Sequence, residues 1–471
     1  MSGIDISRRD WLRFGAAAAA GTLLPGALLH SESARATAPP VPVAKAKRVV
    51  YLFQAGGPSQ LESFDPKPGL AALRGTELPA SVRGNARITS MTAGQGQLNV
   101  ASALVQFAQH GQSGLWVSEL FPYLAARADD LCLIKTTRSD AINHDPATNL
   151  ALTGSQLPGK PSIGAWVSYA LGSLNPNLPA FVSMTSDSKV QFVQPLTKRL
   201  WSSAFLPVNH QGVALRPGAE PVLYLDDGTS LPSAGGLELF DATVRLNQEH
   251  FRSAGDPAIL QRNEAYQIAA SMRSSMRELA DVSGEPDEVF ELYGPNARTP
   301  GSFAANCLRA RRLLERDVRF VLLMHRGWDH HYEVTKHMRT VASDVDQPTA
   351  ALLQDLQRRG LMDDTLFVWG GEFGRTAYSQ GEISATDHGR DHHPYCFPTL
   401  LAGAGIRAGM TYGETDDFSY NAVEDPVHVH DLHATILQLL GQDQNRLTFR
   451  HDGRDHRLTD LGGRIVSDIL S

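Results

Sequence analysis

The chain has 471 residues, of which 42% are hydrophobic and 20% are charged, and its net charge at pH 7 is -7. This composition is ordinary for a soluble globular protein, and the acidic balance without a basic stripe argues against nucleic acid as a partner. The 3 cysteines, Cys132, Cys307 and Cys396, are odd in number and far apart. We therefore expect buried thiols rather than a disulfide framework or a structural zinc site.

Residues 1–36 have the features of a cleavable signal peptide. Residues 7–13 read SRRDWLR, an apolar stretch covers 14–29, and the small-residue site ARA follows at 34–36. A charged start, a short apolar run and such a site are typical of export signals, and the paired arginines indicate the twin-arginine type. A retained anchor is the alternative, but a run of about 16 residues is shorter than the roughly 20 that a spanning helix needs. We expect a periplasmic or secreted protein with no stable membrane span after signal cleavage, and a linker at 37–46.

The rest of the chain alternates predicted strands with predicted helices. Such alternation predicts an α/β fold with a mostly parallel central sheet sandwiched by helices. We expect one domain over 47–471, in which 69–114 is irregular and 185–300 is a partly helical insertion or cap. Strands are expected at 48–53, 131–134, 180–182, 318–324, 365–369 and 398–401, and helices at 118–128, 144–154, 162–171, 237–280, 303–314, 335–359 and 431–440.

Polar residues suited to binding a metal or an anion follow four of these strands. Two further histidines lie in the loop after the last of these four segments. In open α/β sheets, ligands bind beyond the carboxyl ends of the strands, so we expect these side chains to gather at one edge. Imidazoles and carboxylates together are the ligand set of zinc, manganese or iron, and an arginine beside them could hold a tetrahedral oxyanion. The residues are Ser59 after the first strand, His144 after the second, Asp329 and His331 after the strand at 318–324, Glu372 and Arg375 after the strand at 365–369, and His392 and His393 in the next loop.

Each of these segments also has an interpretation without metal chemistry. Residues 329–331 would cap the following helix, and Glu372 would pair with Arg375 to brace its loop. Residues 391–393 would form an exposed polar loop, and residues 144–145 would begin a helix as an N-cap with a satisfied histidine.

Several motifs resemble an exported bacterial family known as "domain of unknown function 1501", and they span essentially the whole mature chain. That family in turn resembles the alkaline phosphatase and sulfatase superfamily, which implies the same α/β fold and a divalent metal, zinc, manganese or calcium. Besides the leader, the motifs are GGPSQ at 56–60, FDPKP at 64–68, GLWVS at 114–118, WDHH at 328–331, GEFGRT at 371–376, GRDHHP at 389–394, GETD at 413–416 and HDLHAT at 430–435.

The chain departs from the superfamily at the positions that carry its chemistry. Where sulfatases place paired aspartates after the first strand, this chain has Gly56 and Gly57, and the nucleophile position is His144. The later aspartate is Glu372, and its partner is Phe373. The resemblance therefore implies either a lost activity or a metal site rebuilt from other residues, namely His144, Asp329, His331, Glu372, His392 and His393.

Two functions of different class follow from these features. The first is an exported metal-dependent hydrolase that acts on a small anionic ester, a sulfate or a phosphate. In it His144 would act as base or ligand, Arg375 would neutralise developing charge, and Ser59 would contact the substrate or an oxyanion. The second is a non-catalytic periplasmic binding or assembly protein that keeps the fold, with a protein partner that the sequence does not name.

Overall fold

The structure is a computed structural model that describes residues 43–190, 195–216, 233–256, 258–260 and 281–471, with residues 263, 275, 278 and 279 between them. Residues 41–471 form one compact unit. The predicted signal peptide at 1–36, and most of the predicted linker at 37–46, lie outside the described residues. Among the described residues, no helix is both long enough and apolar enough to cross a membrane.

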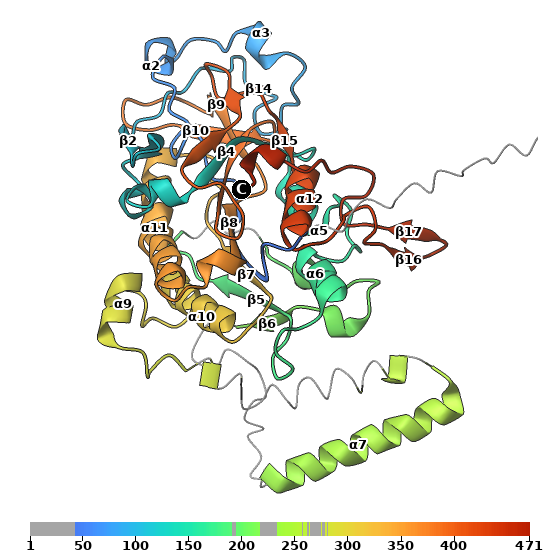
Figure 1. Cartoon of the computed structure of the whole chain (residues 1–471). Helices are drawn as coiled ribbons and strands as arrows, with labels where there is room; N and C mark the ends of the chain where they lie inside the picture. Colours follow the sequence, from blue (N-terminus) through green and yellow to red (C-terminus); the bar gives the residue numbers. More distant parts are fainter. Residues whose placement is uncertain are drawn as a thin grey trace, which may run out of the picture. The chain divides into compact units, whose positions relative to one another are not determined.

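A nine-stranded sheet forms the centre of this unit (Figure 1). Its strand order is β12-β4-β11-β8-β1-β7-β5-β6, with β15 also paired to β4. Neighbouring strands pair in parallel except at β11, which runs antiparallel to both β4 and β8. The expected mostly parallel sheet is confirmed. The strands are β1 (Arg48–Gln54), β4 (Cys132–Arg138), β5 (Phe181–Ser186), β6 (Val213–Leu215), β7 (Phe320–His325), β8 (Thr365–Gly370), β11 (Phe397–Ala402), β12 (Met410–Tyr412) and β15 (Val427–His428).

Helices cover both faces of this sheet. Alternate residues of each central strand enter two separate apolar cores, because successive side chains of a strand point to opposite faces. In β1, Val50 and Leu52 pack in one core with α10 (Phe303–Glu315) and α11 (Val334–Arg358). Val49 and Tyr51 pack in the other with α6 (Ile163–Leu171) and α12 (Val429–Leu439). The cysteines are free and buried, as expected.

The remaining elements are short or lie outside the central sheet. α5 (His144–Thr153) begins at His144 and ends at Gly154, whose φ of 69° is the left-handed conformation that glycine adopts at low cost. The other helices are α2 (Leu70–Leu73), α3 (Ala80–Arg83), α4 (Pro122–Ala125), α7 (Ser233–Ala254) and α9 (Asp287–Tyr293). Small antiparallel pairs are β2 (Phe107–His110) with β3 (Leu115–Ser118), β9 (Gly374–Gln380) with β10 (Gly389–His393), β13 (Glu414–Thr415) with β14 (Ala422–Glu424), and β16 (Phe449–His451) with β17 (Arg454–His456).

Four segments differ from the sequence prediction. The helix expected at 118–128 is present only over its middle, as the short α4, because strand β3 extends to Ser118. The segments expected as loops around Arg375 and His392 form the β9–β10 hairpin. The helix expected at 237–280 is present as α7, which ends at Ala254, and most residues from 261 to 280 lie outside the described part. The segment 185–300 supplies β6 to the sheet, so it is not an insertion throughout.

Candidate metal centre

The side chains of four residues meet beyond the carboxyl ends of the parallel strands. β1, β7 and β8 are parallel neighbours, and β4 runs in the same direction because β11 is antiparallel to both β4 and β8. His144 is the first residue of α5, after β4, and Asp329 and His331 lie in the loop between β7 and α11. His392 comes from β10. The predicted gathering at one sheet edge is therefore present for these four residues.

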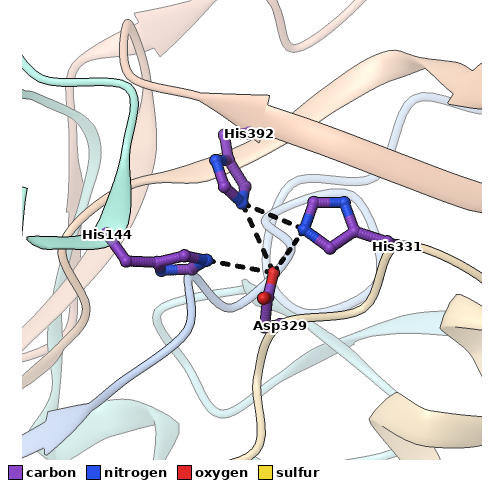
Figure 2. A group of neighbouring side chains, drawn as sticks. All are labelled: His144, Asp329, His331 and His392. Carbon is purple, nitrogen blue, oxygen red and sulfur yellow. Dashed lines mark hydrogen bonds and ion pairs between the residues drawn. The ribbon is translucent and has the colours of Figure 1, made fainter. Parts of the chain in front are cut away.

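One carboxylate oxygen stands at the centre of this cluster (Figure 2). Asp329 Oδ1 lies 2.7 Å from His331 Nε2, 3.1 Å from His144 Nε2 and 3.3 Å from His392 Nε2. The Nε2 atoms of His331 and His392 are 3.1 Å apart. For a tetrahedral ion with bonds of about 2.0 Å, neighbouring ligand atoms are separated by roughly 3.3 Å. Four of the six separations between these atoms are 2.7–3.3 Å, close to this spacing, and all four atoms lie within 4.8 Å of one another.

The second ring nitrogen of each histidine has a hydrogen-bond acceptor of its own. His144 Nδ1 lies 2.8 Å from Glu372 Oε1, and His392 Nδ1 lies 2.8 Å from the Ile142 carbonyl oxygen. His331 Nδ1 lies 2.6 Å from Gln380 Oε1. These acceptors assign the proton of each neutral ring to Nδ1, which leaves the Nε2 lone pairs directed into the cluster. Such outer partners orient metal-binding histidines in proteins.

Charges around the cluster hold the carboxylate ionised. Burial by itself would raise the pKa of Asp329, but the Arg375 guanidinium beside it lowers that pKa well below its usual value. Burial lowers the pKa of His392 to about 3, so that this imidazole is neutral at physiological pH. For His144, burial is outweighed by bonds to Asp329 and Glu372, which raise its pKa. A cation in the cluster would replace the proton that these two carboxylates attract to His144.

Glu372 supports this centre from one side rather than joining it. Its Oε1 accepts from His144 Nδ1 and, at 2.9 Å, from the Gly56 backbone N–H. The interpretation without metal chemistry supposed that Glu372 pairs with Arg375. Its carboxylate instead bonds His144 and the Gly56 N–H. The neighbouring Phe373 ring lies 4.9 Å from the His144 ring and 4.5 Å from the His392 ring, and it forms an apolar wall beside them.

Arg375 is fully buried and binds the loops around the cluster together. Its Nε donates to the Gly57 carbonyl oxygen at 2.9 Å, and its Nη2 donates to the carbonyl oxygens of Gly56 and Trp328 and, at 2.7 Å, to Asp329 Oδ1. The predicted role as an oxyanion holder does not fit this position, because its donors serve the protein and the side chain is closed to solvent.

His393 and Ser59 lie outside the cluster. His393 follows His392 on a strand, so its side chain points to the opposite face, where its Nε2 bonds the Tyr420 carbonyl oxygen at 2.5 Å and burial lowers its pKa to about 4. Ser59 is buried and donates to Glu62.

Two of the interpretations without metal chemistry are wrong. Residues 391–393 are buried and do not form an exposed loop. Helix α11 is capped by Asp387, which accepts from the N–H groups of Thr335 and Lys336, and not by residues 329–331.

Three contributors to the cluster were not predicted from the sequence: Gln380, the Ile142 carbonyl oxygen and the close approach of Gly56. A Cβ atom on Gly56, whose φ is +121°, would lie 2.6 Å from the Asp329 nitrogen. Only a glycine lets the loop after β1 approach the Asp329 backbone this closely. Its position directly after β1 was visible in the sequence, but this role was not.

Comparison with known proteins identifies the family. The family described as "Protein of unknown function (DUF1501)" matches residues 46–470. The chain belongs to this family. DUF1501 was the family expected from the motifs, and this expectation is confirmed. No curated protein matches the sequence.

Solved structures similar to this DUF1501 chain include members of the alkaline phosphatase superfamily. One, from Vibrio parahaemolyticus, has 12% identity and a TM-score of 0.38, over 91% of this chain and 72% of that one. The alkaline phosphatase of the Antarctic bacterium TAB5 has 11% identity and a TM-score of 0.37, over 86% of this chain and 100% of that one. A phosphonate monoester hydrolase from Silicibacter pomeroyi has 14% identity and a TM-score of 0.33, over 74% and 72%. Likeness at this level concerns the fold and carries no conclusion about activity.

Proposed function

We propose that this DUF1501 chain is a metal-dependent hydrolase of phosphate or sulfate esters, with its metal held by His144, Asp329, His331 and His392. The observation that carries the proposal is the convergence of three Nε2 atoms on one carboxylate oxygen, while each Nδ1 is bonded to an acceptor. Unprotonated Nε2 atoms of His331 and His392 at 3.1 Å would direct two lone pairs at each other. A cation between them turns this repulsion into attraction.

The donor set favours a transition metal. Three imidazoles and one carboxylate suit zinc, manganese or iron. Calcium, one of the metals that the resemblance implied, does not fit, because it takes 6–8 oxygen ligands and this cluster offers a single aspartate. With three neutral imidazoles and one carboxylate, a divalent ion leaves the centre with one net positive charge, which attracts an anionic ester.

The side chains have distinct parts in this proposal. A bound divalent ion would polarise an ester oxygen and lower the pKa of a bound water. Glu372, Gln380 and the Ile142 carbonyl oxygen fix the orientation of the imidazoles, and Arg375 fixes that of Asp329. His144 stands at the superfamily's nucleophile position, but both of its nitrogens already face carboxylates. We therefore assign it to the ligand set and not to attack on the substrate.

We further propose that the protein is exported folded by the twin-arginine pathway and acts in the periplasm or outside the cell. The arginine pair at 8–9 and the site at 34–36 support this route. A mature protein that begins at residue 37, isolated from the periplasm and lost from it when Arg8 and Arg9 are both replaced by Lys, would support the proposal. Equal export of the double variant would contradict it.

The activity is tested with 4-nitrophenyl phosphate, 4-nitrophenyl sulfate and a 4-nitrophenyl phosphonate monoester, each with added zinc, manganese or iron(II). We expect turnover of at least one ester, and its loss in Asp329→Asn. Replacement of the neighbouring His330, which is buried and not in the cluster, by Gln serves as the matched control for substitution in the same loop.

A non-catalytic binding or assembly protein is the second candidate. The observation that favours it is that the cluster offers four protein ligands, the number found in structural zinc sites, whereas catalytic zinc sites have three and keep a position open. Hydrolysis at this centre therefore requires a five- or six-coordinate ion. One firmly held metal per chain without turnover of any ester would favour this second candidate.

A further inference from the structure

A second cavity, separate from the metal centre, lies against the central sheet. Its volume is about 650 Å³, and it is bordered by the segment 64–68, the β2–β3 hairpin and strands β4, β12 and β13. Phe64, Val105 and Leu133 form buried apolar parts of its wall, and the Trp116 side chain on β3 is 43% exposed. None of the wall residues belongs to the metal centre. The volume lies within the roughly 300–1,000 Å³ of small-molecule sites.

Four charged side chains meet at one part of this wall. Lys135 Nζ lies 2.6 Å from Glu414 Oε1 and 3.4 Å from Asp65 Oδ1. Lys67 Nζ lies 3.4 Å from Asp65 Oδ1 and 3.5 Å from Glu414 Oε1. Both lysine side chains are 12% exposed, so each needs a negatively charged partner to offset its loss of hydration.

The two carboxylates are held very differently. Asp65 is 4% exposed, and its Oδ2 accepts the hydroxyl groups of Thr415 and Ser419, both at 2.5 Å. Glu414 is 48% exposed, and its partners at this site are the two lysines and its neighbour's N–H group. Asp65 is thus a fixed part of the wall, whereas Glu414 can turn into solvent when another anion takes its place at the lysines.

We propose that this cavity binds an amphipathic organic anion, with a carboxylate or sulfonate group on an aromatic or aliphatic body. The anionic group would replace Glu414 at Lys135 and Lys67, and the body would lie against Phe64, Leu133 and Trp116. With Glu414 turned away, Asp65, Lys67 and Lys135 together carry one net positive charge, which the ligand neutralises. The apolar wall supplies affinity and the lysine pair supplies selectivity for an anion.

The test is isothermal titration calorimetry of the purified full mature chain with naphthalene-2-sulfonate. EDTA is present, so that a metal at the other centre does not compete for the sulfonate. We expect saturable binding of one ligand per chain, and binding at least about tenfold weaker for the uncharged naphthalene-2-sulfonamide. Absence of saturable binding, or equal affinity for the two compounds, would overturn the proposal.

Two variants with opposite expected effects place the ligand. Lys135→Met is expected to weaken sulfonate binding about tenfold, and Glu414→Gln to strengthen it about threefold, because the competing carboxylate is removed. Thermal unfolding shows whether each variant is folded. A gain in sulfonate affinity in Glu414→Gln, with one ligand still bound per chain, cannot result from unfolding of the site. Asp329→Asn and the exposed-surface variant Lys336→Met serve as controls and should bind like the unaltered chain. Unchanged binding in Lys135→Met, weaker binding in Glu414→Gln, or weaker binding in Asp329→Asn would each contradict this location.

Discussion

His331 Nε2 lies 3.1 Å from His392 Nε2, although the two residues come from different elements, the loop after β7 and strand β10. Each ring is held by its Nδ1, which donates to Gln380 Oε1 in one case and to the Ile142 carbonyl oxygen in the other. Two acceptor nitrogens at this separation repel each other unless a proton or a cation lies between them. This pair, together with Asp329 and His144, is the physical basis for the proposed metal centre.

The adjacent β10 residues His392 and His393 provide the sharpest test of which side chains bind the metal. We predict that His392→Ala lowers metal affinity at least about 100-fold, since it removes a ligand. His393→Ala should leave metal affinity nearly unchanged, because that ring bonds Tyr420 on the other face of the strand. Both affinities are measured by competition with a chelator of known affinity. Equal losses in the two variants would show that the cluster does not bind the metal.

These two histidines also show how far the sequence can predict the site. The strand ends, the order of the ligands and the α/β class followed from buried apolar runs that alternate with helical periodicity. The β9–β10 hairpin did not, because its buried positions include Arg375, Arg390 and Asp391, each bonded to a partner far away in the chain. A strand buried through polar pairing shows no apolar alternation, so the sequence could not reveal that His392 and His393 face opposite ways.

Glu372 is expected to act on the metal through His144. Replacing it by Gln keeps an oxygen that can accept from His144 Nδ1 and from the Gly56 N–H, but it removes the charge that makes the imidazole a stronger ligand. We predict a loss of metal affinity of about tenfold, measured by titration of the metal-free protein. The exposed Glu424→Gln is the control for the loss of one negative charge. A loss of the same size in both variants would point to net charge alone.

Gly56 tests whether the backbone geometry of the first loop matters for the centre. In Gly56→Ala, the new Cβ would lie 2.6 Å from the Asp329 nitrogen and 2.8 Å from the Trp328 carbonyl carbon, at a φ of +121°. We predict a loss of both stability and metal affinity, the latter at least about tenfold, because a displacement of Asp329 alters the ligand spacing. Gly75→Ala also has a positive φ, +84°, but meets open space. It should cost only about 1–2 kcal/mol of stability and no metal affinity, and unfolding and metal titrations distinguish the two variants.

The buried ion pair of Glu62 and Arg390 should make the free energy of unfolding depend on pH. Burial opposes ionisation of Glu62, but Arg390, at 2.6 Å, and His388 lower its pKa well below the ordinary glutamate value of 4.5. Between the folded and unfolded pKa values the unfolded chain binds more protons, so this contribution is complete above about pH 4.5 and is lost as the pH falls further. Glu62→Gln should cost about 3–5 kcal/mol at pH 7, because it leaves Arg390 buried without its counter-charge.

The measurement is denaturant-induced unfolding of the unaltered chain and of Glu62→Gln at pH 7 and at pH 4. The stability difference should shrink at the lower pH, because at pH 4 the unfolded unaltered chain binds a proton at Glu62 that the folded chain does not, and this favours unfolding of the unaltered chain alone. A difference that stays constant, or grows, on acidification would contradict the assignment of the buried pair.

The most direct test of the account is the metal content of the protein isolated from the periplasm, where the proposed export would place it, measured by inductively coupled plasma mass spectrometry. The account predicts about one zinc, manganese or iron ion per chain for a single four-ligand site, and its loss in Asp329→Asn while His393→Ala retains it. A chain without metal, or an Asp329→Asn variant with the same metal content as the unaltered chain, would contradict it.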